Sequence, residues 1–356
     1  MSVHRFYLLR FARLATTTLA LWLVFSFLGG ADLFAQGGGG LGPEAQEFVD
    51  NMNRDERLEF HSLNRRERRD YIKEQLGSLS QDATESQDTR ESKNAGTDRA
   101  DILRSVANLE GFVPPRKISQ EVRITVGKNR HPHRGQAVQI QKARGAIETG
   151  LEPKFIGGAD CPEIDSETWA IDYSHKRPWP AIHKGIDIPQ PRGTPIRAIS
   201  DGTVVGKFQN EGNRKGIELM LRHTPEQTGL PFWTYSQYTH LQEMSPLPIG
   251  AEVKIGQKIG KTSNTGKMGR RIRRDALHFA ILYSRQPEWS NNGRYVAPKE
   301  GYWMDPNAFY RLSQPYDSQS LVDLPDDQKK TPVPNLKVDG SFMPPATKRI
   351  WPYRCK

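Results

Sequence analysis

The pattern of apolar and polar residues marks several short β-rich stretches in the second half of the chain. In the last of them Leu277, Phe279 and Ile281 alternate with Ala276, His278, Ala280 and Leu282 at a period of two. The stretches are 194–199, 202–208, 216–223, 232–241, 258–262 and 276–283. Short β-rich stretches of this kind predict β-strands. Turn sequences such as "SDG", "NEGN" and "SNTG" separate them, with no amphipathic helical pattern between. We therefore expect a mostly β fold with an antiparallel sheet.

The sequence on either side of these stretches lacks this pattern. Residues 36–77 begin with a glycine run and continue with helix-forming residues, which predicts one long or two short helices. Residues 78–99 contain almost no large apolar side chain, as is typical of a flexible linker. In 100–160 we expect a short helix at 100–109 and then a connecting segment. The Pro-rich, non-periodic residues 313–356 predict an extended arm over the surface.

The first 35 residues predict an export signal. Arginines near the start are followed by an uncharged apolar run, 14–31, and by small residues around Ala35. The run is also just long enough for a membrane span, so an uncleaved anchor in the inner membrane is the alternative. In either case we expect the body of the protein in the periplasm or on the cell envelope.

The chain carries a formal net charge of +10. A basic exported protein meets polyanions such as cell-wall polymers, lipid headgroups or nucleic acid. The densest basic run, "GRRIRRD" at 269–275, has no interleaved aromatic residue, and we find no nucleic-acid-binding motif. We therefore expect no nucleic-acid partner.

The only cysteines are Cys161 and Cys355. In an oxidising compartment this pair is compatible with one disulfide that ties the C-terminus back to the domain. Two unrelated thiols are the alternative, because sequence spacing does not give the distance between the Cα atoms.

Candidate metal ligands gather in the β-rich part of the chain. His183 and Asp187 lie four residues apart in "HKGID". An extended chain would separate them by about 13 Å, so we expect a bend near Gly185, which also removes an intervening side chain. Taken alone, His278 on the strand at 276–283 would be a structural histidine. Together, the three residues satisfy three positions of a tetrahedral zinc site and leave the fourth open, as in catalytic sites.

A fourth group is His240 in "YSQYTHLQ". We predict that it is an imidazole outside the ligand set that accepts or donates a proton. Tyr238, two residues earlier, should share its face if the strand continues, and it is a weak candidate for a substrate contact.

These motifs together resemble the peptidoglycan metallopeptidases of the LytM/lysostaphin type, family M23. The segments that carry the resemblance are "HKGIDIPQPRGTPIRAISDGTVV", "YTHL", "IGAEVKIGQKIGKTSNTG", "LHFAI" and "MDPNAFY". The resemblance implies an M23-like zinc metallopeptidase domain at 161–312, with zinc on His183, Asp187 and His278 and with His240 assisting. It also implies a β-sheet groove in which a stem peptide or cross-bridge lies extended while zinc activates the attacking water.

The chain departs from the family pattern on the last strand. Active members usually have His-x-His there, and the first position is Ala276 in this chain. Ala276 should point to the same side as His278, whereas Asp275 faces the other way. Losing a positioned proton-transfer group commonly lowers the rate by about 100-fold to 10,000-fold. A second departure is the basic segment 266–275, which could clamp a substrate carboxylate or be an ordinary solvated loop.

Two functions from different classes follow. The first is an exported zinc endopeptidase that cleaves peptide cross-links or stem peptides of peptidoglycan. The alternative, motivated by Ala276, is a catalytically impaired wall-binding module that regulates or positions another cell-wall hydrolase. Peptidoglycan is the expected partner in both cases, and other cell-wall hydrolases or division proteins are further candidates.

The remaining histidines carry weaker signals. We expect His223, at a strand end, to be structural. His131 and His133 lie among proline and arginine with no nearby carboxylate or cysteine, so we do not expect a metal site there. His175 is close in sequence to the predicted site and could line it.

Overall fold

The fold is that of a computed structural model. It describes residues 99–126, 134–165, 168–174, 180–210, 215–267 and 274–356. The predicted export signal, the helices at 36–77 and nearly all of the linker at 78–99 lie outside the described residues. So do His131, His133, His175 and most of the basic segment at 266–275. Among the described helices, none has the length and apolar character needed to cross a membrane.

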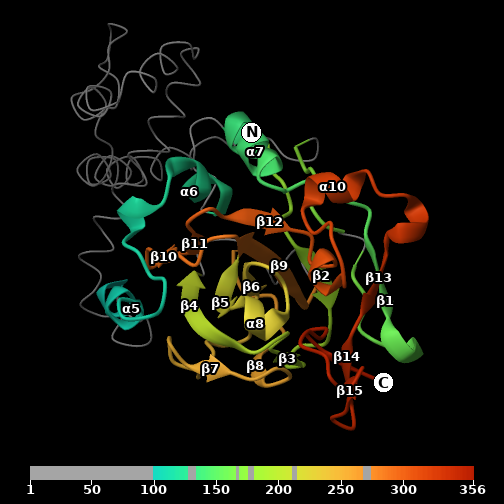
Figure 1. The fold of residues 1–356 in the computed structure, drawn as a ribbon. Coiled ribbons are helices and arrows are strands. Elements are labelled where there is room, and N and C mark those ends of the chain that lie inside the picture. Colours follow the sequence, from blue (N-terminus) through green and yellow to red (C-terminus); the bar gives the residue numbers. More distant parts are fainter. Residues whose placement is uncertain (1–98, 127–133, 166–167, 175–179, 211–214, 268–273) are drawn as a thin grey trace, which may run out of the picture. The chain divides into compact units, whose positions relative to one another are not determined.

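An antiparallel sheet of seven strands forms the centre of the described part (Figure 1). Its strand order is β12-β9-β6-β5-β4-β7, and β2 pairs with β9 beside β12. The strands are β2 (Ile186–Pro189), β4 (Gly202–Asn210), β5 (Gly216–His223), β6 (Trp233–Thr239), β7 (Glu252–Val253), β9 (Ala276–Ser284) and β12 (Tyr302–Met304). The mostly β, antiparallel fold predicted from the β-rich stretches is confirmed.

Shorter strands and helices surround the sheet. The other strands are β1 (Glu152–Phe155), β3 (Pro195–Arg197), β8 (Lys258–Lys261), β10 (Trp289–Asn291), β11 (Val296–Pro298), β13 (Lys330–Val333), β14 (Asn335–Lys337), β15 (Phe342–Met343) and β16 (Arg354–Cys355). The α-helices are α5 (Arg99–Val106), α6 (Gln120–Val126), α7 (Arg134–Ala143), α8 (Pro225–Thr228) and α10 (Ser318–Val322). Short 3-10 turns are η2 (Pro115–Lys117), η3 (Ile156–Gly158), η4 (Ala308–Tyr310) and η5 (Asp326–Gln328). Helix α5 (Arg99–Val106) lies where a short helix is expected at 100–109.

The two faces of the sheet have different partners. We call the face that carries Asp187 and His278 the metal face, and the opposite one the core face. On the core face, the rings of Tyr238 and Phe279 lie 5.5 Å apart. On the metal face, the β10–β11 hairpin packs against β4, because a Cβ on Gly206 would lie 2.8 Å from Val296 Cγ2. Asn291 of the hairpin also donates through Nδ2 to the Val205 carbonyl at 2.9 Å.

The C-terminal segment is fastened into the structure rather than laid on its surface. Strand β13 pairs in parallel with β1, and β14 pairs with both β15 and β16. Trp351, in the loop before β16, is fully buried. The chain is extended there, as its composition predicts, but its aromatic side chains bury too much apolar surface for a detached arm.

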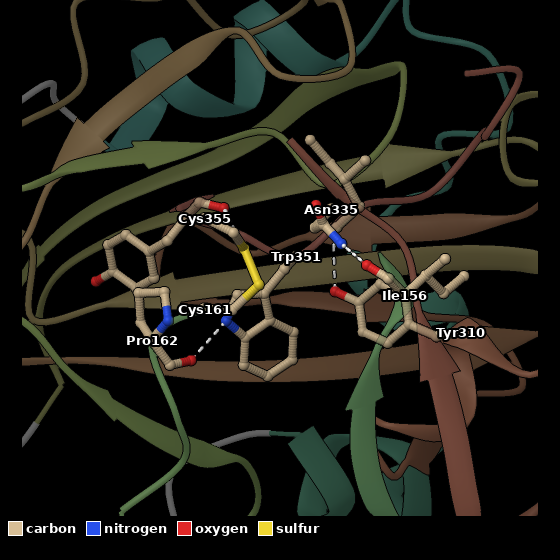
Figure 2. The surroundings of a disulfide bond; sticks show 9 residues. Ile156, Cys161, Pro162, Tyr310, Asn335, Trp351 and Cys355 are labelled. Atoms are coloured by element: carbon tan, nitrogen blue, oxygen red, sulfur yellow. Dashed lines mark hydrogen bonds between the residues drawn. A yellow bond between two sulfur atoms is a disulfide. The ribbon is translucent and has the colours of Figure 1, made fainter. Parts of the chain in front are cut away.

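A disulfide joins Cys161 to Cys355, across a sequence separation of 194 residues. Figure 2 shows the bond beside Trp351, whose indole Nε1 donates to the Pro162 carbonyl at 2.9 Å. Reciprocal backbone hydrogen bonds of 3.1 and 2.9 Å between Asp160 and Lys356 flank it. Of the two alternatives left open by the sequence, the structure forms the disulfide.

Candidate metal centre

Two paired strands bring the metal-ligand candidates together. Asp187 on β2 and His278 on β9 are direct partners in the antiparallel register, so their side chains lie on the same face of the sheet. His183 precedes β2, and its backbone N–H donates to the Ile171 carbonyl at 2.8 Å. The bend expected in "HKGID" is therefore present, with His183 outside the strand and Asp187 within it.

Gly185 leaves the space that the His278 ring occupies. A Cβ at that position would lie 2.7 Å from the Cε1 and Nε2 atoms of the His278 ring and from the Phe279 carbonyl oxygen. Real Cβ atoms do not approach other atoms so closely, so no larger residue fits without displacing the imidazole. The glycine predicted to clear the space between the ligands does so.

The donor atoms of His183, Asp187 and His278 meet at one point. His183 Nε2 lies 3.0 Å from His278 Nδ1 and 3.4 Å from Asp187 Oδ1, and His278 Nδ1 lies 2.9 Å from the same oxygen. Donors about 2.0–2.1 Å from a tetrahedral zinc ion lie about 3.3–3.4 Å from one another. Among the described residues, these three are the group of His, Cys, Asp and Glu side chains close enough to share a cation.

The protonation states also suit a cation. Burial opposes ionisation of Asp187, but hydrogen bonds from His183 and His278 outweigh it and hold the pKa of this carboxyl well below its usual range. Burial lowers the pKa of His278 and favours the neutral ring. Metal ions bind carboxylates and neutral imidazoles, so Asp187 and His278 are in the form that binding requires.

The cluster remains open on one side. The side chains of His183, Asp187 and His278 are 12%, 16% and 15% exposed. A fully enclosed structural site would leave its ligands no such exposure, whereas a catalytic site keeps one coordination position for water or substrate. The donor set and its exposure therefore fit a catalytic zinc site.

His240 lies directly after β6, next to this cluster. Its imidazole is buried, and its ring centroid is 6.0 Å from that of His278. Nδ1 lies 3.1 Å from the Thr265 carbonyl and donates its proton there, which places the lone pair on Nε2. The backbone of His240 has a φ of +64°, an uncommon conformation for a residue other than glycine.

The structure does not bring Tyr238 into the site. It lies on the core face, has no exposed surface, and accepts a hydrogen bond at its hydroxyl from the Ile199 N–H at 3.4 Å. The substrate contact expected for it requires the strand alternation to continue to His240. The strand ends at Thr239, and the left-handed backbone of His240 turns its ring away from the Tyr238 side.

Ala276 lies at the start of β9, opposite Pro189 on β2. It is two residues before His278 on the metal face, and it is 8% exposed. No other imidazole in the described residues takes its place, because His223 lies elsewhere. His223 is fully buried, and its ring nitrogens contact the Asp201 carbonyl at 2.6 Å and Ser236 Oγ at 2.8 Å, as expected for a structural residue.

Two groups beside His183 were not predicted from the sequence. The Thr168 carbonyl lies 3.4 Å from His183 Nδ1, and such a contact orients a ligand ring. The Tyr173 ring lies 6.1 Å from the His183 ring. Both come from a segment without a recognisable motif, so only their position in the fold identifies them.

The β-rich part of the chain is similar to known proteins. Residues 181–298 match the family model described as Peptidase family M23. The uncharacterized lipoprotein YgeR of Escherichia coli (strain K12) is 27% identical over 202 residues, which are 54% of this chain and 72% of that protein. The peptidoglycan DD-endopeptidase ShyC of Vibrio cholerae is 36% identical over 101 residues, 28% of this chain and only 20% of the relative. A solved structure described as the structural characterization of LytU is 26% identical and covers 46% of this chain and 88% of that one, with a TM-score of 0.29.

Proposed function

The chain belongs to peptidase family M23 through residues 181–298, and from this we propose that the protein is an exported zinc endopeptidase that cleaves cross-links or stem peptides of peptidoglycan. The observation that carries the proposal is the cluster of His183, Asp187 and His278. Their donor atoms lie within 2.9–3.4 Å of one another and stay partly exposed.

We assign the three residues as the ligands of a zinc ion. When bound, zinc supplies a Lewis acid for the scissile carbonyl and lowers the pKa of a water molecule. The chain contributes the geometry: the pairing of β2 with β9 fixes Asp187 and His278, and the carbonyl of Thr168 orients His183.

We assign His240 as the group that transfers the proton. Its Nδ1–H is held by Thr265, so Nε2 can accept a proton from the attacking water and deliver it to the leaving amine. Its ring lies beside His278 without joining the cluster of donor atoms. This separation is what a proton-transfer residue needs, because a metal ligand cannot also carry a proton on the ligating atom.

Three observations support a cell-wall substrate outside the cytoplasm. ShyC is named as a peptidoglycan endopeptidase, and YgeR is named as a lipoprotein. The Cys161–Cys355 disulfide is typical of oxidising compartments. The order of basic, apolar and small residues at 1–35 is that of an export signal.

Zinc analysis and peptide cleavage on the purified full chain test the proposal. We expect about one zinc ion per chain and cleavage of cross-linked stem peptides. Asp187→Ala should lose both, whereas Asp327→Ala, an exposed control on η5, should keep both. The proposal fails if the protein retains no zinc, if Asp187→Ala binds zinc as well as the parent does, or if the zinc-loaded protein leaves the peptides intact.

A further inference from the structure

A row of four side chains crosses the metal face of the sheet. Asp187 on β2 pairs with His278 on β9, His278 pairs with Thr239 on β6, and Thr239 pairs with Glu218 on β5. Directly paired residues project from the same face, and neighbouring strands are about 4.8 Å apart. Glu218 therefore lies about 10 Å from His278 on the face that carries the metal ligands.

Glu218 is a buried carboxylate with two partners. It is 2% exposed; Gln237 Nε2 donates to its Oε1 at 2.6 Å, and Lys215 Nζ lies 3.3 Å from its Oε2. A buried carboxylate is unfavourable unless it is hydrogen-bonded and paired with a cation. Glu218 therefore anchors the Lys215 ammonium at this side of the metal face.

The main chain of Lys215 is fixed against the proton-transfer residue. The backbone N–H of His240 donates to the Lys215 carbonyl at 3.1 Å. Next to it, Gly216 has a φ of +65° and lies so close to Thr265 that a Cβ would be 2.3 Å from the Thr265 carbonyl carbon. The Thr265 carbonyl in turn accepts the Nδ1–H of His240. Lys215 and His240 are thus held in one rigid arrangement.

The Lys215 side chain still reaches solvent. It is 38% exposed, in contrast to its partner Glu218. An ammonium that is held by a buried carboxylate and is itself partly exposed is placed to meet a bound substrate.

We propose that the Lys215 ammonium binds a carboxylate of the peptide substrate. The proposal rests on the function proposed above. Glu218, which holds the ammonium, lies two strand spacings, about 10 Å, from His278. An extended peptide rises about 3.3 Å per residue, so it would cover this distance with about three residues. Lys215 therefore selects substrates with a free carboxylate about three residues from the bond that is cut, and Glu218 is the positioning residue that holds the ammonium there.

A pair of matched substrates tests this selection on the full chain. The two cross-linked stem peptides differ only in that their side-chain carboxylates are free in one and primary amides in the other. We expect the zinc-loaded protein to cleave the free acid with a kcat/KM about 10-fold higher, mainly through a lower KM, because charge-assisted hydrogen bonds contribute on this scale.

Variants of Lys215 show whether this residue causes the preference. Lys215→Met should cleave both peptides at the rate that the parent shows for the amide, and Lys215→Arg should keep the preference for the acid. The matched control is Lys258→Met, which removes an exposed lysine from β8 and should keep the parental ratio. If Lys215→Met leaves Glu218 unpaired and unfolds, Lys215→Met with Glu218→Gln removes both charges together.

The outcomes separate this inference from the proposed function. If Lys215→Met keeps the parental preference for the acid, or if the parent has none, the inference is wrong while the peptidase function stands. If the zinc-loaded parent cleaves neither peptide, the proposed function is wrong. Calorimetric titration of the same peptides then still measures the ratio of dissociation constants, and equal binding of acid and amide overturns the inference.

Discussion

At the scale of single residues, His240 holds the most unusual position in the candidate site. A left-handed backbone costs a non-glycine residue on the order of 1 kcal/mol or more and persists where the surrounding structure enforces it. Hydrogen bonds to Lys215 and Thr265 fix the backbone and the ring of His240, respectively. The strain is therefore held in place next to the metal ligands, where it aims the imidazole at the site.

This position predicts that His240 acts on the rate and not on metal binding. In His240→Asn, a residue that tolerates the left-handed backbone, kcat should fall by about 100-fold to 10,000-fold. The zinc content should stay at the parental value, because the donor atoms of the ligands are untouched. Turnover assays and elemental analysis on the same samples check this, and loss of zinc equal to that of Asp187→Ala would make His240 a ligand instead.

The position of Ala276 predicts that a histidine introduced there raises the peptidase activity. Ala276 projects from the metal face two residues before His278, so an imidazole there would enter the site. Ala276→His should raise kcat by up to about 100-fold, as expected for an added proton-transfer group. Asp275→His, one residue earlier and on the opposite side, is the matched control and should leave kcat unchanged. An Ala276→His protein that keeps zinc and gains no rate would show that this position has no part in the reaction.

At the scale of elements, the strands and the first two metal-ligand candidates were predictable because each is encoded in one short segment of the sequence. The β-rich stretches bounded by turn sequences predicted β4, β5, β6 and β9 because both signals lie within one short segment. The ligand pair in "HKGID" was predictable because the glycine and the spacing of the donors lie in one short segment. His278 could be predicted as the third ligand once His183 and Asp187 were known as a ligand pair.

Features that depend on the pairing of distant strands were not predictable. The row from Asp187 to Glu218 depends on the registers of several strand pairs, which no single segment encodes. Tyr238 was misplaced because the period of two was extended past Thr239, where the left-handed backbone of His240 breaks it. Helices α6 and α7 were missed because they are short and flank a segment without apolar periodicity.

The turn after β12 predicts a pH-dependent stability. Asp305 is buried there, accepts a hydrogen bond from the Thr149 hydroxyl and another from the Asn307 N–H at 2.8 Å. Burial raises the pKa of Asp305 from 3.8 to about 7, with a smaller contribution from the charge of Glu148. The folded protein thus binds this proton more tightly than the unfolded chain, so the stabilisation is complete below about pH 4 and is lost as the pH rises through about 7.

Asp305→Asn removes this titration. Between pH 5 and pH 8 the free energy of unfolding of the parent should fall by up to a few kcal/mol more than that of the variant. Urea denaturation at several pH values measures the difference, with Asp327→Asn at an exposed site as the control. Parallel pH profiles for the parent and Asp305→Asn would mean that Asp305 is ionised in the folded protein throughout this range.

At the scale of the whole described part, the family segment depends on residues outside it. The match ends at residue 298, but Trp351 is buried and lies 5.9 Å from the Tyr310 ring. The Arg197 N–H donates to the Pro352 carbonyl at 2.8 Å, and the Ile350 N–H donates to the Ile199 carbonyl at 2.8 Å. The C-terminal segment therefore closes the structure around β3 and β4, and a fragment cut at residue 298 would expose a large apolar surface.

The Cys161–Cys355 disulfide holds the C-terminal segment in this position. It links residues 194 positions apart, so it restricts the unfolded chain strongly, and bonds of this kind typically stabilise a protein by about 2–4 kcal/mol. Replacing Cys161 and Cys355 by serine should lower the free energy of unfolding by this amount. Zinc content should be unchanged, because neither cysteine belongs to the His183, Asp187 and His278 cluster.

Chemical denaturation with and without a thiol reductant tests the same bond without mutation. The reductant should lower the midpoint of the parent to that of the double serine variant and should leave the variant unchanged. Both samples should bind zinc at low denaturant, since the ligands depend on the pairing of β2 with β9. Mass spectrometry should report free thiols in the reduced parent. If its denaturation midpoint is nevertheless unchanged, burial of Trp351 alone holds the C-terminal segment.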